Sequence, residues 1–159
     1  MKPIIIISIC LIFTTSIYGQ NYTLSELIKI NNYVLDEFDT YVTQKGYKYY
    51  KSDSTEFSES TSYAYTVNGI NKSYISKYYR KLVNNEMVDF QTSDNTIYLK
   101  IKSELKMLGF KFVKTGTFQG GTYFDYIKGK IEVSLTSLPQ EVFNGNKSTI
   151  YEIAVTTNY

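Results

Sequence analysis

Two stretches of the chain place apolar residues at the three- and four-residue spacing of an amphipathic helix. Thr23 and Glu26 open the first stretch as a capping box, and Lys45 with Gly46 suits a helix C-terminus. We therefore expect one helix between Thr23 and Lys45. Its apolar positions are Leu27, Ile28, Leu35, Phe38 and Val42.

The second stretch predicts a helix that begins near Ser93 or Asp94 and ends at Gly109, in the same way as the first. Both helices are expected to lay one apolar face on a common core. The apolar positions of the second helix are Ile97, Ile101, Leu105 and Leu108.

Short segments with a two-residue alternation of apolar and polar residues follow each helix and predict strands. Ile75, Tyr78, Tyr79 and Leu82 also fit a helix, but we predict a strand there because its counterpart at 131–135 alternates cleanly. The predicted strands are 47–52, 61–67, 73–80 and 87–92, then 110–115, 118–127, 131–137 and 150–157.

The two halves of the chain resemble each other in sequence. Gly46-Tyr-Lys-Tyr-Tyr-Lys-Ser52 recurs 63 residues later as Gly109-Phe-Lys-Phe-Val-Lys-Thr115. We expect an α+β fold made of a tandem repeat, in which one helix precedes a four-stranded antiparallel meander and the helices pack on one face of the sheet. The repeats would span about 20–92 and 93–159 of a single domain.

Strand parity predicts which side chains face the helices and which face outward. The outward set is mixed polar and aromatic, so it is expected to meet solvent or a partner. The inward set is Phe110, Phe112, Phe124, Tyr126, Ile131, Val133, Leu135, Ile153 and Val155, with Tyr47, Tyr49, Tyr63, Tyr65, Val88 and Phe90. The outward set is Lys48, Tyr50, Lys111, Tyr123, Asp125, Glu132 and Glu152.

The tandem unit of helix, glycine, Tyr or Phe, lysine and aromatic residue resembles a group of small exported bacterial proteins of unknown function. The doubled helix-plus-four-strand layout also resembles the architecture of the beta-lactamase inhibitor protein family. That resemblance implies a binding or inhibitory role. The family typically carries disulfides, which this chain cannot form within itself because it has one cysteine.

The start of the chain has the composition of a secretory signal. Lys2 precedes an apolar run from Ile4 to Ile17, and Gly19 fits the last position before cleavage. We expect residues 1–19 to be a signal peptide and the protein to act in the periplasm or outside the cell. Cys10 would leave with the signal, and an uncleaved anchor is the alternative.

The composition argues against several kinds of chemistry. The whole chain has no histidine, so a histidine-based triad and the usual zinc sites are not expected. Gly120-Gly121 lies between strands and does not open a helix, as a phosphate-binding loop would. The net charge of +2 does not favour nucleic acid. We expect no cofactor, no metal and no membrane span after signal cleavage.

Three acidic residues form a candidate carboxylate cluster. If Lys128-Gly129 is a two-residue turn, Asp125 lies opposite Glu132, and Glu152 joins them from the next strand. Two close carboxylates bind a cation or divide acid and base roles. The alternative is that Lys111 neutralises them at the surface.

We predict a non-catalytic binding protein of unknown partner, with an inhibitor or immunity role as one version. Its contact candidates are Tyr50, Tyr74, Tyr78 and Tyr123, since tyrosine makes large contact surfaces. The alternatives are a hydrolase that uses the carboxylate pair and a structural envelope protein that self-associates through an edge strand.

Overall fold

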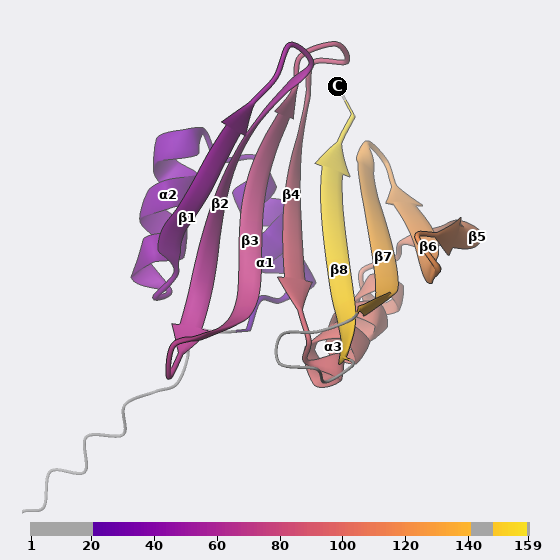
Figure 1. Cartoon of the computed structure of the whole chain (residues 1–159). Coiled ribbons are helices and arrows are strands. Elements are labelled where there is room, and N and C mark those ends of the chain that lie inside the picture. The colour runs from indigo at the N-terminus through magenta and orange to yellow at the C-terminus, as the bar shows by residue number, and fades with distance from the viewer. Residues whose placement is uncertain (1–20, 141–147, 159) are drawn as a thin grey trace, which may run out of the picture.

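Eight antiparallel strands form a single sheet in the computed structural model, which describes residues 21–140 and 148–158 (Figure 1). The expected signal segment lies outside the described residues. The strand order is β1-β2-β3-β4-β8-β7-β6-β5, so β4 and β8 pair at the centre and β1 and β5 are the edges. The strands are β1 (Lys48–Ser54), β2 (Ser58–Val67), β3 (Ile70–Arg80), β4 (Asn85–Thr92), β5 (Lys111–Phe118), β6 (Gly121–Lys128), β7 (Ile131–Gln140) and β8 (Ser148–Thr157).

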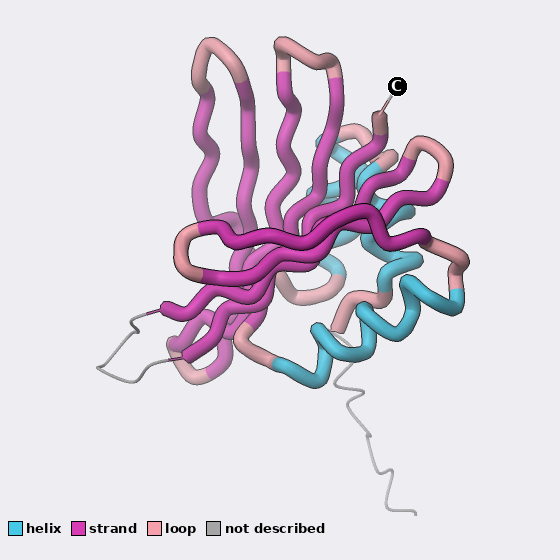
Figure 2. Tube along the Cα trace, turned by 90° about the vertical axis from the view of Figure 1, so that its right-hand side faces the viewer, coloured by secondary structure: helices cyan, strands magenta, loops and turns pink. Residues whose placement is uncertain are grey.

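Three helices, α1 (Leu24–Asn31), α2 (Leu35–Gln44) and α3 (Asn95–Met107), lie on one side of this sheet (Figure 2). The α+β class is therefore confirmed. The eight strands agree with the predicted segments to within a few residues, and 73–80 lies inside β3.

The prediction of one helix from Thr23 to Lys45 is wrong, because the helix breaks between α1 and α2. The capping box of Thr23 and Glu26 is present. At the break, the Asn32 side chain donates to the Ile28 carbonyl at 3.2 Å, and Val34 adopts an extended backbone. Asparagine side chains compete for backbone hydrogen bonds in this way and so favour helix ends.

The ends of α2 and α3 have the same geometry. Gly46 and Gly109 follow them with φ of 87° and 78°, a region that favours glycine. The next residues, Tyr47 and Phe110, donate their backbone N–H groups back to the last helical turns at 3.1 and 2.9 Å.

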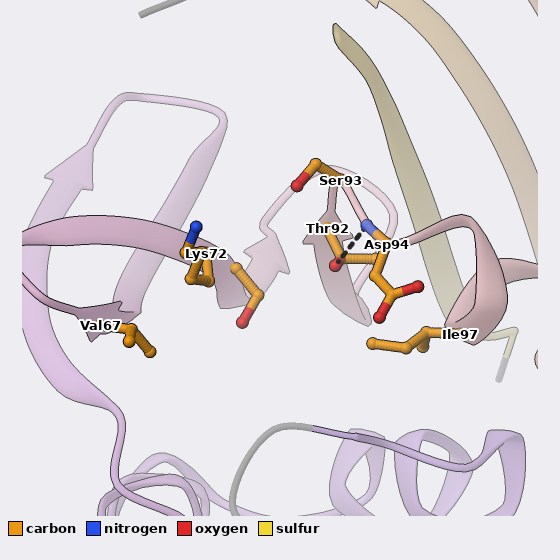
Figure 3. Close-up of a pocket in the computed structure, with 7 residues that line it drawn as sticks. Val67, Lys72, Thr92, Ser93, Asp94 and Ile97 are labelled. Atoms are coloured by element: carbon orange, nitrogen blue, oxygen red, sulfur yellow. Dashed lines mark hydrogen bonds between the residues drawn. The ribbon is translucent and has the colours of Figure 1, made fainter.

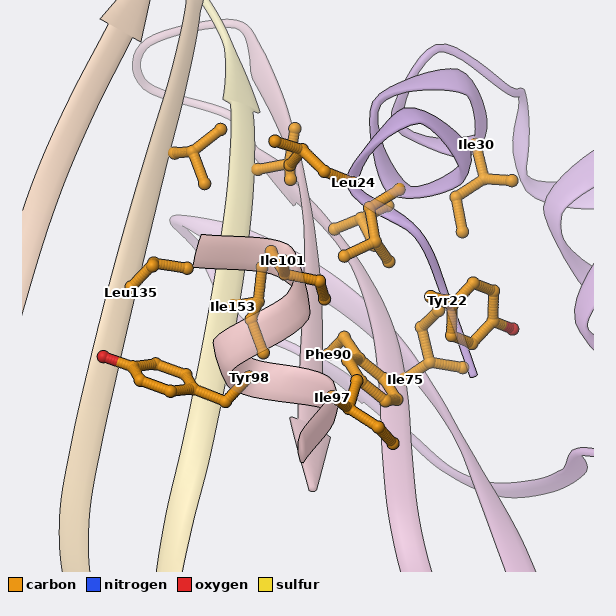
Figure 4. Packing of buried hydrophobic residues seen from close by; sticks show 14 of the residues in the cluster. Tyr22, Leu24, Ile30, Ile75, Phe90, Ile97, Tyr98, Ile101, Leu135 and Ile153 are labelled. Carbon is orange, nitrogen blue, oxygen red and sulfur yellow. The ribbon is translucent and has the colours of Figure 1, made fainter. Parts of the chain in front are cut away.

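The core fills the space between the helices and the inner strands, as Figure 4 shows for Leu24, Ile101, Phe90 and Ile153. Most of the expected inward residues are buried or partly buried there. Tyr49 and Phe112 are exceptions, with 63% and 56% of their surface exposed. Both lie on edge strands, where the sheet extends beyond the helices.

Candidate functional site

The sheet face without helices, called the open face below, carries its side chains in three rows that cross all eight strands. The central row, from β1 to β5, is Lys51, Ser62, Ser76, Asp89, Ala154, Ser134, Asp125 and Lys114. On one side lies the Gln91 row: Lys48, Ala64, Tyr74, Gln91, Glu152, Thr136, Tyr123 and Gly116. On the other lies the Met87 row: Asp53, Ser60, Tyr78, Met87, Thr156, Glu132, Ile127 and Lys111.

The four candidate tyrosines all lie on the open face, but the structure does not gather them into one cluster. The rings of Tyr50 and Tyr74 meet edge to face, with centroids 5.3 Å apart. Tyr123 is four strands from Tyr74, a separation of about 19 Å at the usual strand spacing. Its ring covers Gly116, where an added Cβ would lie 2.6 Å from the tyrosine oxygen.

Four residues of the central row are buried although no described helix covers them. Ser62, Ser76, Asp89 and Asp125 are each less than a tenth exposed. The Ser76 hydroxyl donates to Ser62 at 2.8 Å. The side chains of the central row are short on the inner strands, so the longer side chains of the Gln91 row and the Met87 row cover them.

The expected pairing of Asp125 with Glu132 is wrong. The turn between β6 and β7 is one residue later than predicted, at Gly129-Lys130, and Gly129 has φ of 59°. Asp125 therefore pairs with Ser134, and Glu132 lies opposite Ile127. The structure therefore does not bring the three candidate carboxylates together in the expected arrangement.

Asp125 has a basic neighbour, but it is not the expected Lys111. A bulge in β5 shifts the register after Phe112, so Lys114 lies opposite Asp125 and Lys111 lies opposite Ile127. The Lys114 Nζ is 3.6 Å from the Asp125 Oδ2. Asp125 is therefore paired with a lysine, as the alternative from the sequence anticipated, but the lysine is a different one and the carboxylate is buried.

Glu152 belongs instead to a carboxylate pair with Asp89, which the sequence reasoning missed. Gln91 lies between them: its Nε2 donates to the Asp89 Oδ2 at 2.9 Å and to the Glu152 Oε2 at 3.4 Å. The other oxygen of Asp89, Oδ1, is buried and has no hydrogen-bond partner. One amide nitrogen thus serves two carboxylates.

Burial and mutual repulsion both oppose the charges of this pair. Burial raises the pKa of Asp89 well above its ordinary value, and the charge of Glu152 raises it further. Burial also raises the pKa of Glu152. Beside them, burial raises the pKa of Tyr78, and the charge of Asp89 adds to that effect. Strand alternation makes Asp89 an ordinary outward residue between the inward Val88 and Phe90, so no local signal in the sequence marked its burial.

A separate cavity of about 260 Å³ lies at the end of the sheet beside the start of α3 (Figure 3). There the Asp94 N–H donates to the Thr92 hydroxyl at 3.1 Å. The cavity does not include any of the four candidate tyrosines. Its lining residues are Val67, Lys72, Ser73, Thr92, Ser93, Asp94 and Ile97.

Among residues 21–140 and 148–158, no three or more acidic, histidine or cysteine side chains are grouped so that they could hold a metal ion. Within the same residues, no helix is both long and apolar enough to cross a membrane.

Comparison with known proteins found no matching family model, no matching curated protein and no matching solved structure.

Proposed function

We propose that this is an exported, non-catalytic binding protein that holds a partner against the open face of its sheet. The observation that carries the proposal is that all three helices lie on the other face (Figure 2). Among the described residues no helix covers the open face, which leaves its eight strands available for contact. The open face also carries exposed and half-exposed tyrosines, a residue type that is enriched at protein interfaces.

The tyrosines support this role because they combine a large contact area with few rotatable bonds. Tyr50 is half exposed, and its ring is held by Tyr74. The Tyr74 hydroxyl in turn accepts a hydrogen bond from the Asn71 side chain at 2.8 Å. These contacts hold the aromatic groups in place before a partner arrives, which reduces the entropy lost on binding.

The test compares capture of envelope proteins by the immobilised chain, residues 20–159, and by two variants. Tyr50→Ala removes an open-face ring. Tyr49→Ala removes the adjacent exposed ring, which points to the other face. We expect Tyr50→Ala to lose the captured partner and Tyr49→Ala to keep it. Equal capture by both variants would exclude an open-face interface.

We also propose that the chain arose by duplication of a helix-plus-four-strand unit. The support is local. The bulges at Tyr50 in β1 and Val113 in β5 are 63 residues apart, the same spacing as the sequence repeat and as Gly46 and Gly109. An inhibitor or immunity role is the version of the binding function that the architectural resemblance favours.

Self-association through a sheet edge is a second candidate, because both edges are open. Every residue of β1 is exposed, and β5 is exposed apart from Gly116. An exposed edge strand readily pairs with another chain. Light scattering over a range of concentrations tests this candidate, and a monomer at every concentration would refute it.

A further inference from the structure

We infer that Asp89 and Glu152 form a receptor site for one basic side chain, best an arginine, carried by the partner on the open face. This inference rests on the proposed function and adds the chemistry of the partner. The site lies where β4 and β8 pair, at the centre of the sheet, with Gln91 directly opposite Glu152.

The first argument is that the pair lacks hydrogen-bond donors. Two ionised carboxylates offer four oxygen atoms, each able to accept more than one bond. Gln91 supplies one nitrogen to two of these oxygens. The buried Asp89 Oδ1 receives nothing from the described residues. A buried acceptor without a donor is costly, so the pair is incomplete as it stands.

The second argument is that the described basic side chains do not reach the pair. Lys114 faces Asp125, and Lys77, on the strand next to β4, projects to the helix side. There it is buried and donates to the Asn31 carbonyl at 2.7 Å. On the open face, four acidic residues lie on inner strands and four lysines lie on the edge strands β1 and β5, although Asp53 also lies on β1. Arg80, on β3, donates to the Met87 sulfur at 3.3 Å. The centre therefore favours a cation from outside the chain.

The third argument concerns the shape of the cation. A guanidinium group is planar and carries five N–H donors, so it can serve both carboxylates at once. Tyr78 lies close enough for its pKa to respond to Asp89 and Glu152, and an aromatic ring attracts a cation over its face. Calcium, by contrast, takes six to eight oxygen ligands, more than this pair supplies.

Entry of the cation requires side chains to turn aside, because Asp89 is only 4% exposed. Gln91, Glu152 and Tyr78 are partly exposed and lie on the solvent side of the strands. Rotamer changes of this kind are common when interfaces form without backbone movement. The arginine would then replace the amide of Gln91 as the donor to Asp89.

The experiment uses nuclear magnetic resonance on residues 20–159 with a small probe in place of the partner. The probe is Nα-acetyl-arginine methylamide, and its control is the citrulline analogue, which has nearly the same shape without the charge. We expect the arginine probe to shift the Gln91 side-chain amide in a saturable manner. The citrulline probe should bind at least about tenfold more weakly, the ratio for a difference of 1.4 kcal/mol.

Two variants should weaken the binding of the arginine probe to the level of the citrulline probe, and one variant should not. Asp89→Asn and Glu152→Gln each remove a charge from the pair with little change in volume. Asp125→Asn is the matched control, because it removes the other buried aspartate of the same row. Retained binding by Asp89→Asn, or equal binding of arginine and citrulline, would overturn the inference.

Two further outcomes separate this inference from its alternatives. If calcium chloride alone shifts Gln91 and displaces the arginine probe, the pair is a metal site and the assignment to a side chain is wrong. If the probe does not bind while Tyr50→Ala still abolishes partner capture, this inference fails and the proposed function stands. If the probe binds while Tyr50→Ala leaves partner capture unchanged, the site for a basic side chain stands and the proposed interface at Tyr50 fails.

Discussion

Replacing Asp89 with asparagine is expected to make the protein more stable at neutral and alkaline pH. The carboxylate is buried on the open face, and its Oδ1 has no donor. Leaving such a group unsatisfied costs about 1–3 kcal/mol. Asparagine removes the charge, still accepts the hydrogen bond from Gln91, and can donate its own amide toward Glu152. The gain should fall in the same range of about 1–3 kcal/mol.

The pH dependence of this gain follows from the direction of the pKa shift. Asp89 has a raised pKa in the folded protein, whereas an unfolded aspartate titrates near about 3.9. Below that pH the carboxyl is protonated in both states, and no penalty exists. As the pH rises through the folded pKa, the folded state must take on the buried charge, and its stability decreases. The stability gained by Asp89→Asn should therefore appear as the pH rises and vanish in acid.

Thermal unfolding of both proteins between pH 3 and pH 9 measures this effect. For a domain of this size about 1 kcal/mol corresponds to about 3 °C, so the variant should melt about 3–9 °C higher at pH 8. Asp125→Asn is the control: Asp125 lies beside Lys114, so its replacement should bring no gain. A variant at Asp89 that melts lower at pH 8, or a difference independent of pH, would refute the reasoning.

Two other predictions concern stability. Burial tends to raise the pKa of Glu26, but hydrogen bonds from the side chain of Lys45, the backbone of Thr23 and the side chain of Tyr41 outweigh it and lower that pKa to about 2. The stabilisation of the fold by ionised Glu26 is present above the unfolded pKa of 4.5 and is lost as the pH falls toward 2. After allowance for solvent screening, Glu26→Gln should lower the free energy of unfolding in urea by about 1–2 kcal/mol at pH 7. Below pH 2 it should have no effect. Gly121→Ala should cost about 3 kcal/mol in the same assay, because its Cβ would lie 2.1 Å from a backbone oxygen of β7. Gly129→Ala, which has open space but positive φ, should cost about 1 kcal/mol, and equal losses for the two glycines would contradict this account.

Local sequence patterns predicted the elements because they depend on neighbouring residues. Strand alternation placed Tyr123 and Glu152 on the face away from the helices, since parity along a strand decides the face. The capping box at Thr23 was predicted because both of its partners lie within one helical turn. The break after Asn31 was not predicted, because the apolar spacing continues across it and hides the competing hydrogen bonds of Asn32.

The exact register between paired strands, even between neighbours in the chain, was decided by the tertiary structure alone. A shift of one residue in the β6–β7 turn moved Glu132 away from Asp125, and one bulge in β5 exchanged Lys111 for Lys114. Such shifts cost little locally and change which side chains meet across the sheet.

The sequence by itself determined that strands alternate, where the first and last helices begin, and that the outer face carries tyrosines and acids. Only the tertiary structure brought Asp89 beside Glu152, because β4 and β8 are far apart in the chain and pair at the centre of the sheet. The electrostatic cost of that pair arises from burial and proximity together, and neither is a property of a residue in isolation.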